Sequence, residues 1–238
     1  MFHTSLPPPL AVHYSLLSLS KDDLRTRYDA TVARAFTSIK DHSQFLLDRA
    51  ESYEDAQMAD ATVLELGCGF GISAAAYAAL GARQVTGREP DESTVTRAQQ
   101  LLNEWLPTKY SERLELTAAE LWAPVEAPVD VVVVSGREAS AQNVATLSSW
   151  LKPNGRVLLL GTNQRARRRS ETTAYGPAVD PYDITRSFEA AGFDTKLLRP
   201  HDGIESLKDR GLRLLYPWTL PAFSTFRLLA TKKATASS

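Results

Sequence analysis

The chain has 238 residues, of which 43% are hydrophobic and 23% are charged, and its formal net charge is −1. This length suits one α/β domain with a small appendage and a full hydrophobic core. A charge near zero gives no global field for nucleic acid or a membrane surface, so any anion-binding role must come from a local patch. The single cysteine, Cys68, excludes an internal disulfide and a cysteine-only zinc cage.

The pattern of apolar residues along the chain indicates in which cellular compartment the protein is expected. The N-terminal sequence MFHTSLPPPLAVHY has no basic start followed by an apolar run, so it does not resemble a signal peptide. No apolar stretch reaches the roughly 18 residues that a membrane-spanning helix needs. We therefore expect a cytoplasmic protein.

Residues 1–60 are predicted to form a leader and a helical cap. Three consecutive prolines in the leader exclude a helix there. From Ser20 onward, apolar residues recur every three or four positions, which indicates one apolar helical face. These residues are Leu24, Tyr28, Val32, Phe36 and Ile39. The helical signal continues over residues 45–47, after a break near residues 41–43.

From residue 62 onward, predicted strands and helices alternate, which is typical of a parallel sheet with helices on both faces. The strand cores VLEL, VVVV and VLLL are continuously apolar, as expected when both faces of a sheet are covered. The predicted strands span 62–66, 84–87, 113–117, 129–134 and 155–161, followed by FDTKLLRP and FRLLATKK. The predicted helices span 71–80, 92–106, 139–151 and 181–191. KPNG, before the fifth strand, is predicted to be a turn, and residues 234–238 to be frayed.

The glycine-rich sequence GCGFG joins the first strand to the first helix. Glycines at Gly67, Gly69 and Gly71 let the backbone approach a ligand closely. Ligands bind at this edge of a doubly wound sheet, and N–H groups at the helix start favour a negative ligand group. Glu89, at the end of the second strand, is placed to take two ribose hydroxyls. The order of strand, turn, helix, strand and acid predicts a nucleoside site.

Two features distinguish between nucleoside cofactors. A dinucleotide fingerprint is GxGxxG, whereas this turn is GxGxG followed by Ile72. Glu65, two residues before the first glycine, would repel a diphosphate but attract an ammonium group. The two acids therefore favour an amino acid joined to a nucleoside over NAD or NADP, and an NAD(P)-dependent oxidoreductase is the weaker alternative.

The sequences VLELGCGFG, VTGREPDE, VDVVVVSG and LSSWLKPNGRVLLLG resemble the successive motifs of the class I S-adenosylmethionine-dependent methyltransferases. FRLLATKK resembles the final strand of that family. The resemblance implies a Rossmann-like, doubly wound, seven-stranded and mostly parallel α/β sheet, with an antiparallel last strand beside the sixth. It further implies that residues 61–233 form the domain that binds S-adenosyl-L-methionine.

The resemblance also assigns roles to individual residues. Glu65, Gly67, Gly69 and Gly71 would surround the methionine moiety, Glu89 would bind the ribose, Pro90 would pack on adenine, and Ser135 would lie near the cofactor. Two features depart from the family. Arg88 replaces the usual apolar residue before the ribose acid, which puts a charge beside the site or turned outward. Either Glu120 or Ala119 takes the place of the acid that often meets the adenine amine.

No catalytic constellation is visible in the sequence. Methyl transfer from a sulfonium is an in-line displacement in which orientation of the reactants is the main contribution, so a general base is needed only for an acceptor that stays protonated. The histidines have no metal-ligand spacing, and we predict no metal site. His13 and His201 are the residues to test as bases, and the catalytic residue stays unassigned.

Two segments bear on the acceptor. Residues 165–169, RARRR, could bind a substrate phosphate or carboxylate or an anionic membrane, or form a solvated loop. Residues 214–226 carry no charge and could wall an apolar pocket, touch a membrane interface or pack on the cap. We expect a small apolar or amphipathic acceptor molecule. The sequence is compatible with peripheral membrane contact and with a homo-oligomer, and it decides neither. The absence of a broad basic surface argues against nucleic acid.

Three other functions would use similar motifs. The first is the NAD(P)-dependent oxidoreductase discussed above. The second is a protein that binds S-adenosylmethionine without transferring methyl, as a regulatory module or a catalyst of rearrangement. The third is a methyltransferase that acts on protein or RNA.

Overall fold

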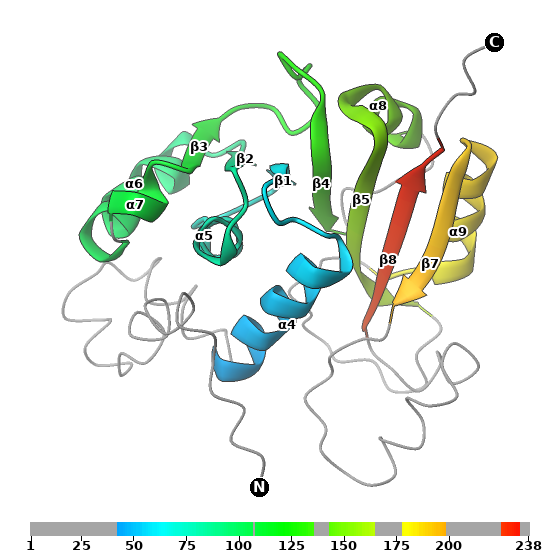
Figure 1. The fold of residues 1–238 in the computed structure, drawn as a ribbon, viewed down its shortest axis with the longest axis horizontal. Helices are drawn as coiled ribbons and strands as arrows, with labels where there is room; N and C mark the ends of the chain where they lie inside the picture. Colours follow the sequence, from blue (N-terminus) through cyan, green and yellow to red (C-terminus); the bar gives the residue numbers. More distant parts are fainter. Residues whose placement is uncertain (1–41, 107, 136–142, 165–177, 199–224, 234–238) are drawn as a thin grey trace, which may run out of the picture. The chain divides into compact units, whose positions relative to one another are not determined.

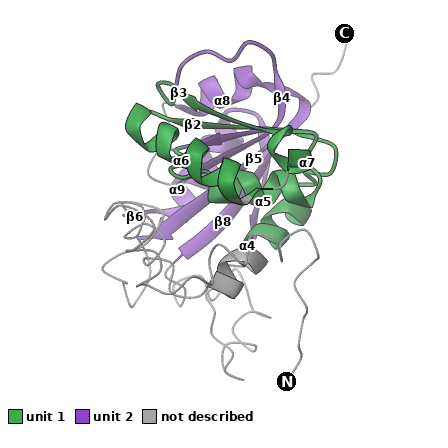
Figure 2. Cartoon of the chain, turned by 90° about the vertical axis from the view of Figure 1, so that its left-hand side faces the viewer, with its two compact units in different colours: residues 1–62, 67–121 green, residues 63–66, 122–238 purple. Residues whose placement is uncertain are grey.

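The computed structural model describes residues 42–106, 108–135, 143–164, 178–198 and 225–233 (Figure 1). The chain divides into two compact units (Figure 2). The first unit comprises residues 1–62 and 67–121, and the second comprises residues 63–66 and 122–238.

In the first unit, the described helices and strands alternate. They are α4 (His42–Asp55), α5 (Ile72–Leu80), β2 (Gln84–Glu89), α6 (Glu92–Trp105), α7 (Thr108–Ser111) and β3 (Leu114–Ala118). Strands β2 and β3 are parallel, and their register runs from Val85↔Leu114 to Glu89↔Ala118. Residues 74–79 of α5 are all buried, and five of these six residues are alanines. Such small side chains allow a helix to pack closely on its neighbours.

The second unit contains the centre of the sheet. Its elements are β1 (Thr62–Leu66), β4 (Val129–Ser135), α8 (Val144–Trp150), β5 (Leu151–Asn163), β6 (Ala178–Val179), α9 (Pro181–Ala190), β7 (Phe193–Leu198) and β8 (Thr225–Lys232). The first residue of β1, Thr62, is assigned to the first unit. The apolar runs VVVV in β4 and VLLL in β5 are buried on both faces. Helix α9 lies along β7 (Figure 1), where the rings of Phe188 and Phe193 meet edge to face at 5.3 Å.

The strands follow the order β3-β2-β1-β4-β5-β8-β7, and β6 pairs with β5 outside this path. β8 is antiparallel to both of its neighbours, whereas β1, β4 and β5 pair in parallel. This topology confirms the predicted Rossmann-like fold with an antiparallel last strand beside the strand FDTKLLRP. The predicted count of seven strands omitted β6, which adds an eighth.

The bounds of β5 differ from the prediction. This strand begins at Leu151, so KPNG lies inside it rather than in a turn before it. The pairing of β4 with β5 shifts register between Val129 and Val131, where extra residues of β5 are accommodated. Asn154 adopts a φ of 61° there, a conformation that asparagine tolerates better than most residues.

Several predictions lie outside the described residues. These include the leader, the apolar helical face from Leu24 to Ile39, and the tail at residues 234–238. The helical signal at residues 45–47 falls within α4, and the boundary between cap and main domain stays a prediction. Among the described residues, no helix combines the length and hydropathy of a membrane span.

Lys232 at the end of β8 links three elements of the second unit. Its ammonium group donates hydrogen bonds to the carbonyl oxygens of Ser148 at 2.8 Å and Leu151 at 3.0 Å. These carbonyls belong to the C-terminal end of α8, where a cation is favourable.

We predict that Lys232→Met lowers the free energy of unfolding by about 1–2 kcal/mol, because the carbonyls lose charged donors. Urea unfolding at neutral pH measures this change. Lys233→Met is the matched control, since Lys233 makes an exposed ion pair with Asp194 at 3.2 Å. Equal effects of the two substitutions would contradict the assigned role of Lys232.

Candidate functional site

The glycine turn after β1 is held against the end of β2. The N–H groups of Gly67 and Cys68 both donate to the carbonyl oxygen of Arg88, at 2.8 and 3.0 Å. Gly67, Gly69 and Gly71 have φ values of 69°, 54° and 69°, which a residue with a Cβ rarely adopts. A Cβ at Gly67 or Gly69 would have no heavy atom within 4 Å. The turn therefore borders open space that only side chains or a ligand could fill.

Gly71 and a second glycine, Gly87 of β2, are required for a different reason. A Cβ at Gly71 would lie 2.8 Å from a methyl group of Leu116, and one at Gly87 would lie 2.7 Å from the other methyl group. The sulfur of Cys68 would be 2.8 Å from the Cβ at Gly87. Cys68, which is buried, therefore packs beneath the turn.

Glu89 connects the turn to the start of α6. Its Oε2 atom accepts the N–H of Gly69 at 3.1 Å, and its Oε1 atom accepts the N–H of Asp91 at 3.4 Å. The side chain is half-buried, so this charge-assisted contact is only partly screened by water. The sequence predicted Glu89 as a ribose ligand. The structure shows that this carboxylate holds the glycine turn, and its role as a ribose ligand stays a prediction.

Asp91 begins α6. Its carboxylate accepts the N–H groups and the hydroxyl groups of Ser93 and Thr94. The hydrogen bonds from Thr94 and Ser93 lower the pKa of Asp91 below its usual 3.8. Because the carboxylate form is favoured in the folded state, this contribution to stability is present above the unfolded pKa. It is lost as the pH falls through the lowered value.

The backbone carbonyl of Arg88 accepts hydrogen bonds from the glycine turn, whereas the Arg88 side chain points away from the face of β2 that carries Glu89. Successive side chains of a strand point to opposite faces, so Arg88 projects from the face opposite to Gly87 and Glu89. Burial lowers the pKa of the Arg88 guanidinium. Of the two placements that the sequence left open, the structure favours a charge turned away from the face of Glu89.

The remaining predicted residues of the first unit lie near Glu89. Pro90 is exposed between β2 and the start of α6. The N–H of Ala119 donates to the carbonyl oxygen of Glu89 at 3.2 Å, and Glu120 follows it with an exposed side chain. Ala119 is thus the residue that continues the pairing of β3 with β2, and the acid comes one position later.

Glu65 and Ser135 belong to the second unit. Glu65 lies on β1 with 8% of its surface exposed, and it pairs in register with Val133 of β4. Ser135 is the last residue of β4, is half-buried and pairs with Leu160 of β5. Because residues 133 and 135 face the same side of β4, Glu65 and Ser135 share one face of the sheet.

Other predicted candidates cannot be placed. His13, His201, the arginines of residues 165–169 and the apolar segment 214–226 lie outside the described residues. Within the described part of the chain, no group of three or more His, Cys, Asp or Glu side chains is arranged to hold a metal ion.

Fold and turn together define a class of protein: a Rossmann-like α/β domain with a glycine turn and an acid at the end of the second strand. Residues 63–155 match the family model described as a methyltransferase domain. A search of curated proteins gave no match.

Solved structures confirm the fold. Magnesium protoporphyrin IX methyltransferase (ChlM) from Synechocystis PCC 6803 is similar over 98% of this chain and 100% of its own, with 18% identity and a TM-score of 0.57. The glycopeptide N-methyltransferase MtfA is similar over 78% and 87%, with 18% identity and a TM-score of 0.59. The [4+2]-cyclase SpnF is similar over 79% and 82%, with 17% identity and a TM-score of 0.53.

Residues 63–155 are thus similar to a methyltransferase domain, and the strand order of the sheet agrees with that match.

The packing beneath the turn gives a prediction that does not depend on a ligand. Gly87→Ala should lower the free energy of unfolding by about 1–3 kcal/mol, because its methyl group overlaps Leu116 and Cys68. Cys68→Ala in the same chain should recover part of this loss, since it removes the overlapping sulfur atom. Denaturant unfolding of the four members of this double-mutant cycle measures the coupling. A neutral Gly87→Ala would contradict the close packing.

Proposed function

We propose that this protein transfers a methyl group from S-adenosylmethionine to a small apolar or amphipathic acceptor. The observation that supports the proposal most strongly is the glycine turn, which borders open space and is fixed by the Glu89 carboxylate. A nucleoside ligand needs this combination of a close backbone approach and a hydroxyl acceptor.

The residues present fit the cofactor. Glu89 would accept the ribose hydroxyls, and the backbone of Gly67 and Gly69 would approach the methionine moiety. Glu65 would attract its ammonium group, since a buried carboxylate favours a cation. Pro90 would pack on adenine, with Ala119 or Glu120 at its edge, and Ser135 would lie near the cofactor. When bound, the cofactor supplies a methyl group on a positively charged sulfur.

The protein's contribution would be alignment. In-line displacement requires the acceptor atom, the methyl carbon and the sulfur to lie on one axis, and such orientation can supply about 7–11 kcal/mol of the barrier. The fixed glycine turn and the fixed Glu89 carboxylate would hold the cofactor, and with it the sulfur end of this axis, in one orientation. A general base would be needed only for acceptors protonated at working pH. We infer a small acceptor from the uncharged segment 214–226 and from the nearly neutral chain.

A second function uses the same site. The protein could bind S-adenosylmethionine without transferring its methyl group, and the similarity of its fold to a [4+2]-cyclase supports keeping this alternative. Product analysis separates the two. Formation of S-adenosylhomocysteine in proportion to a methylated acceptor supports methyl transfer, whereas a broad acceptor panel that yields no S-adenosylhomocysteine from the bound cofactor favours the alternative.

We predict that Glu89→Ala weakens S-adenosylhomocysteine binding by about 1.5–3 kcal/mol, or roughly 10- to 150-fold, because charge-assisted contacts to the ribose are lost. Glu89→Gln, which keeps one acceptor oxygen, should lose less. Isothermal titration calorimetry measures both.

Glu92→Ala is the matched control, since Glu92 is an exposed acid three positions along, in the first turn of α6. The unfolding midpoint of each variant should be recorded as well, because Glu89 also holds Gly69. Unchanged affinity in a folded Glu89→Ala variant would refute the site assignment.

A further inference from the structure

Strand β7 is the last strand of the sheet in the second unit. In the described part of the chain it pairs with β8 alone, in a register that runs from Phe193↔Lys232 to Leu198↔Arg227. In an antiparallel pair, alternate residues direct their N–H and C=O groups to the partner strand, and the residues between them direct these groups away from it. Half of the backbone groups of β7 therefore point to its outer edge, which is a template for pairing with a further strand.

Helix α9 packs on one face of β7. The ring of Phe193 meets the ring of Phe188 edge to face, and the hydroxyl of Thr195 donates to the Oε1 atom of Glu189 at 2.7 Å. The helix also contacts β8, so it lies over the face of these two strands. Its contacts with β7 are made by side chains of that face, and they leave the backbone groups of the outer edge unused.

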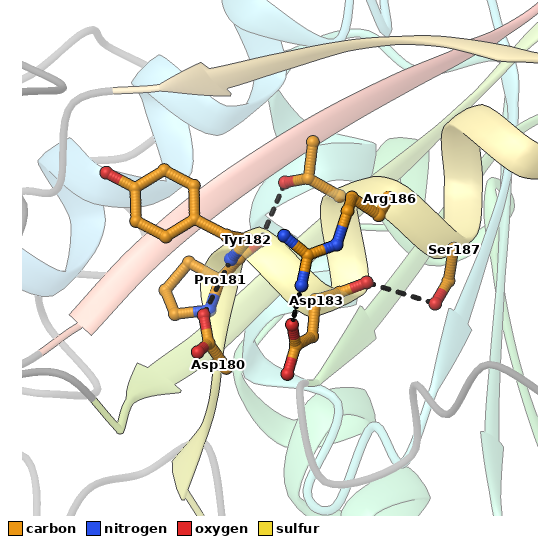
Figure 3. A network of polar contacts seen from close by, with 7 residues as sticks. Asp180, Pro181, Tyr182, Asp183, Arg186 and Ser187 are labelled. Carbon is orange, nitrogen blue, oxygen red and sulfur yellow. Dashed lines mark hydrogen bonds and ion pairs between the residues drawn. The ribbon is translucent and has the colours of Figure 1, made fainter.

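The other side of α9 is polar and faces solvent. There Arg186 pairs with the Asp183 carboxylate, and the hydroxyl of Ser187 donates to the carbonyl oxygen of Asp183 at 3.0 Å (Figure 3). Asp183 and Arg186 are both exposed. These polar groups bond within the helix, while Ile184 and Phe188 on its apolar side are buried.

The face of β7 opposite to α9 carries two exposed charges. Asp194 and Lys196 alternate with Phe193 and Thr195 along the strand, so they project from the face that α9 does not cover. Asp194 forms an exposed ion pair with Lys233 at 3.2 Å. A lysine at a sheet edge opposes pairing with other chains, but here an acid stands two residues before it. This spacing of opposite charges makes the edge complementary to its own copy.

A second copy of the strand fits in one antiparallel register. With a two-fold axis at Thr195, each Asp194 lies directly opposite Lys196 of the other copy, and their Cβ atoms are about 4.5–5.5 Å apart. This holds whichever alternate residues point outward, because the axis can pass through a hydrogen-bonded or a non-hydrogen-bonded pair. An axis at Asp194 or at Lys196 would instead place like charges opposite each other, which is destabilising.

We propose that the outer edge of β7 binds a second copy of this chain, and that Asp194 and Lys196 set the register of the pair. The two sheets continue into each other across the β7 strands, and the α9 helices of both copies lie on the same face. One short strand from each copy makes a small interface, so the dimer dissociates on dilution. This inference does not depend on the proposed function.

Sedimentation velocity of the full chain over a concentration series, at low ionic strength, gives the dissociation constant of the dimer. Two charge reversals are compared with the wild type. Asp194→Lys places lysine opposite lysine twice, and Lys196→Glu places acid opposite acid twice. Lys109→Glu is the matched control, since Lys109 is an exposed lysine of α7 in the first unit. Circular dichroism and the unfolding midpoint show that each variant is folded.

We expect the wild type and Lys109→Glu to form dimers with the same dissociation constant. Either reversal in β7 should raise this constant by about 10- to 100-fold, because two attractive pairs become repulsive. An equimolar mixture of the two reversed chains should form a heterodimer, since the acids of one chain then face the lysines of the other. The double variant Asp194→Lys/Lys196→Glu should dimerise as the wild type does.

Four results would overturn the inference. They are a wild type that stays monomeric over the whole series, a dissociation constant that neither reversal in β7 changes, an equal loss in Lys109→Glu, and a mixture of the reversed chains with no more dimer than either chain alone. The mixture and the double variant separate a specific pairing of charges from a general effect of either substitution on the fold.

Discussion

The contact between the Glu89 carboxylate and the N–H of Gly69 is the interaction on which the candidate site depends. The glycine turn adopts three positive φ angles, and the N–H groups of Gly67 and Gly69 pair with the end of β2 instead of within a helix. Without a fixed acceptor, such a turn would sample many conformations. Glu89 holds it from the end of β2 and also accepts the N–H of Asp91, where α6 begins. One carboxylate thus connects the glycine turn, strand β2 and the start of helix α6 in the first unit.

The Glu89 carboxylate keeps acceptor capacity for a ligand beside these two contacts. A carboxylate has about four acceptor positions on its two oxygens, and the N–H groups of Gly69 and Asp91 use one on each oxygen. Ribose hydroxyls could therefore donate to Glu89 while it still holds the turn. The second unit is built differently, since paired strands on both sides of β5 fix the chain up to Val179.

The sequence was sufficient to predict the parts that local signals determine. The strands around VLEL and VVVV, the alanine-rich helix α5 and the positive φ of Asn154 all follow from apolar runs and from glycine or asparagine preferences. The turn and the acid after β2 could be recognised because their order along the chain is itself the signal. The placement of Arg88 away from Glu89 follows from strand alternation once the bounds of β2 are known.

Other features depend on contacts that the sequence does not encode locally. The pairing of Glu89 with Gly69 joins residues 20 positions apart, and the tight space at Gly87 exists only because Leu116 and Cys68 converge there. Strand β6 has two residues, which is too short for any periodic signal. KPNG has the composition of a turn, but the neighbouring strand extends the pairing past it with a register shift. Tertiary pairing thus prevailed over local turn preference.

The central claim is that the glycine turn and Glu89 bind the nucleoside of S-adenosylmethionine. The most direct measurement is a thermal-shift titration of the purified chain with S-adenosylhomocysteine, S-adenosylmethionine, NAD and NADP. A ligand at a hundred times its Kd adds about 2.7 kcal/mol to the free energy of unfolding. For a chain of this length, that raises the unfolding midpoint by roughly 5–10 °C. We predict this rise with the two sulfur nucleosides alone, and a rise with NAD or NADP, or with none of the four, would contradict the account.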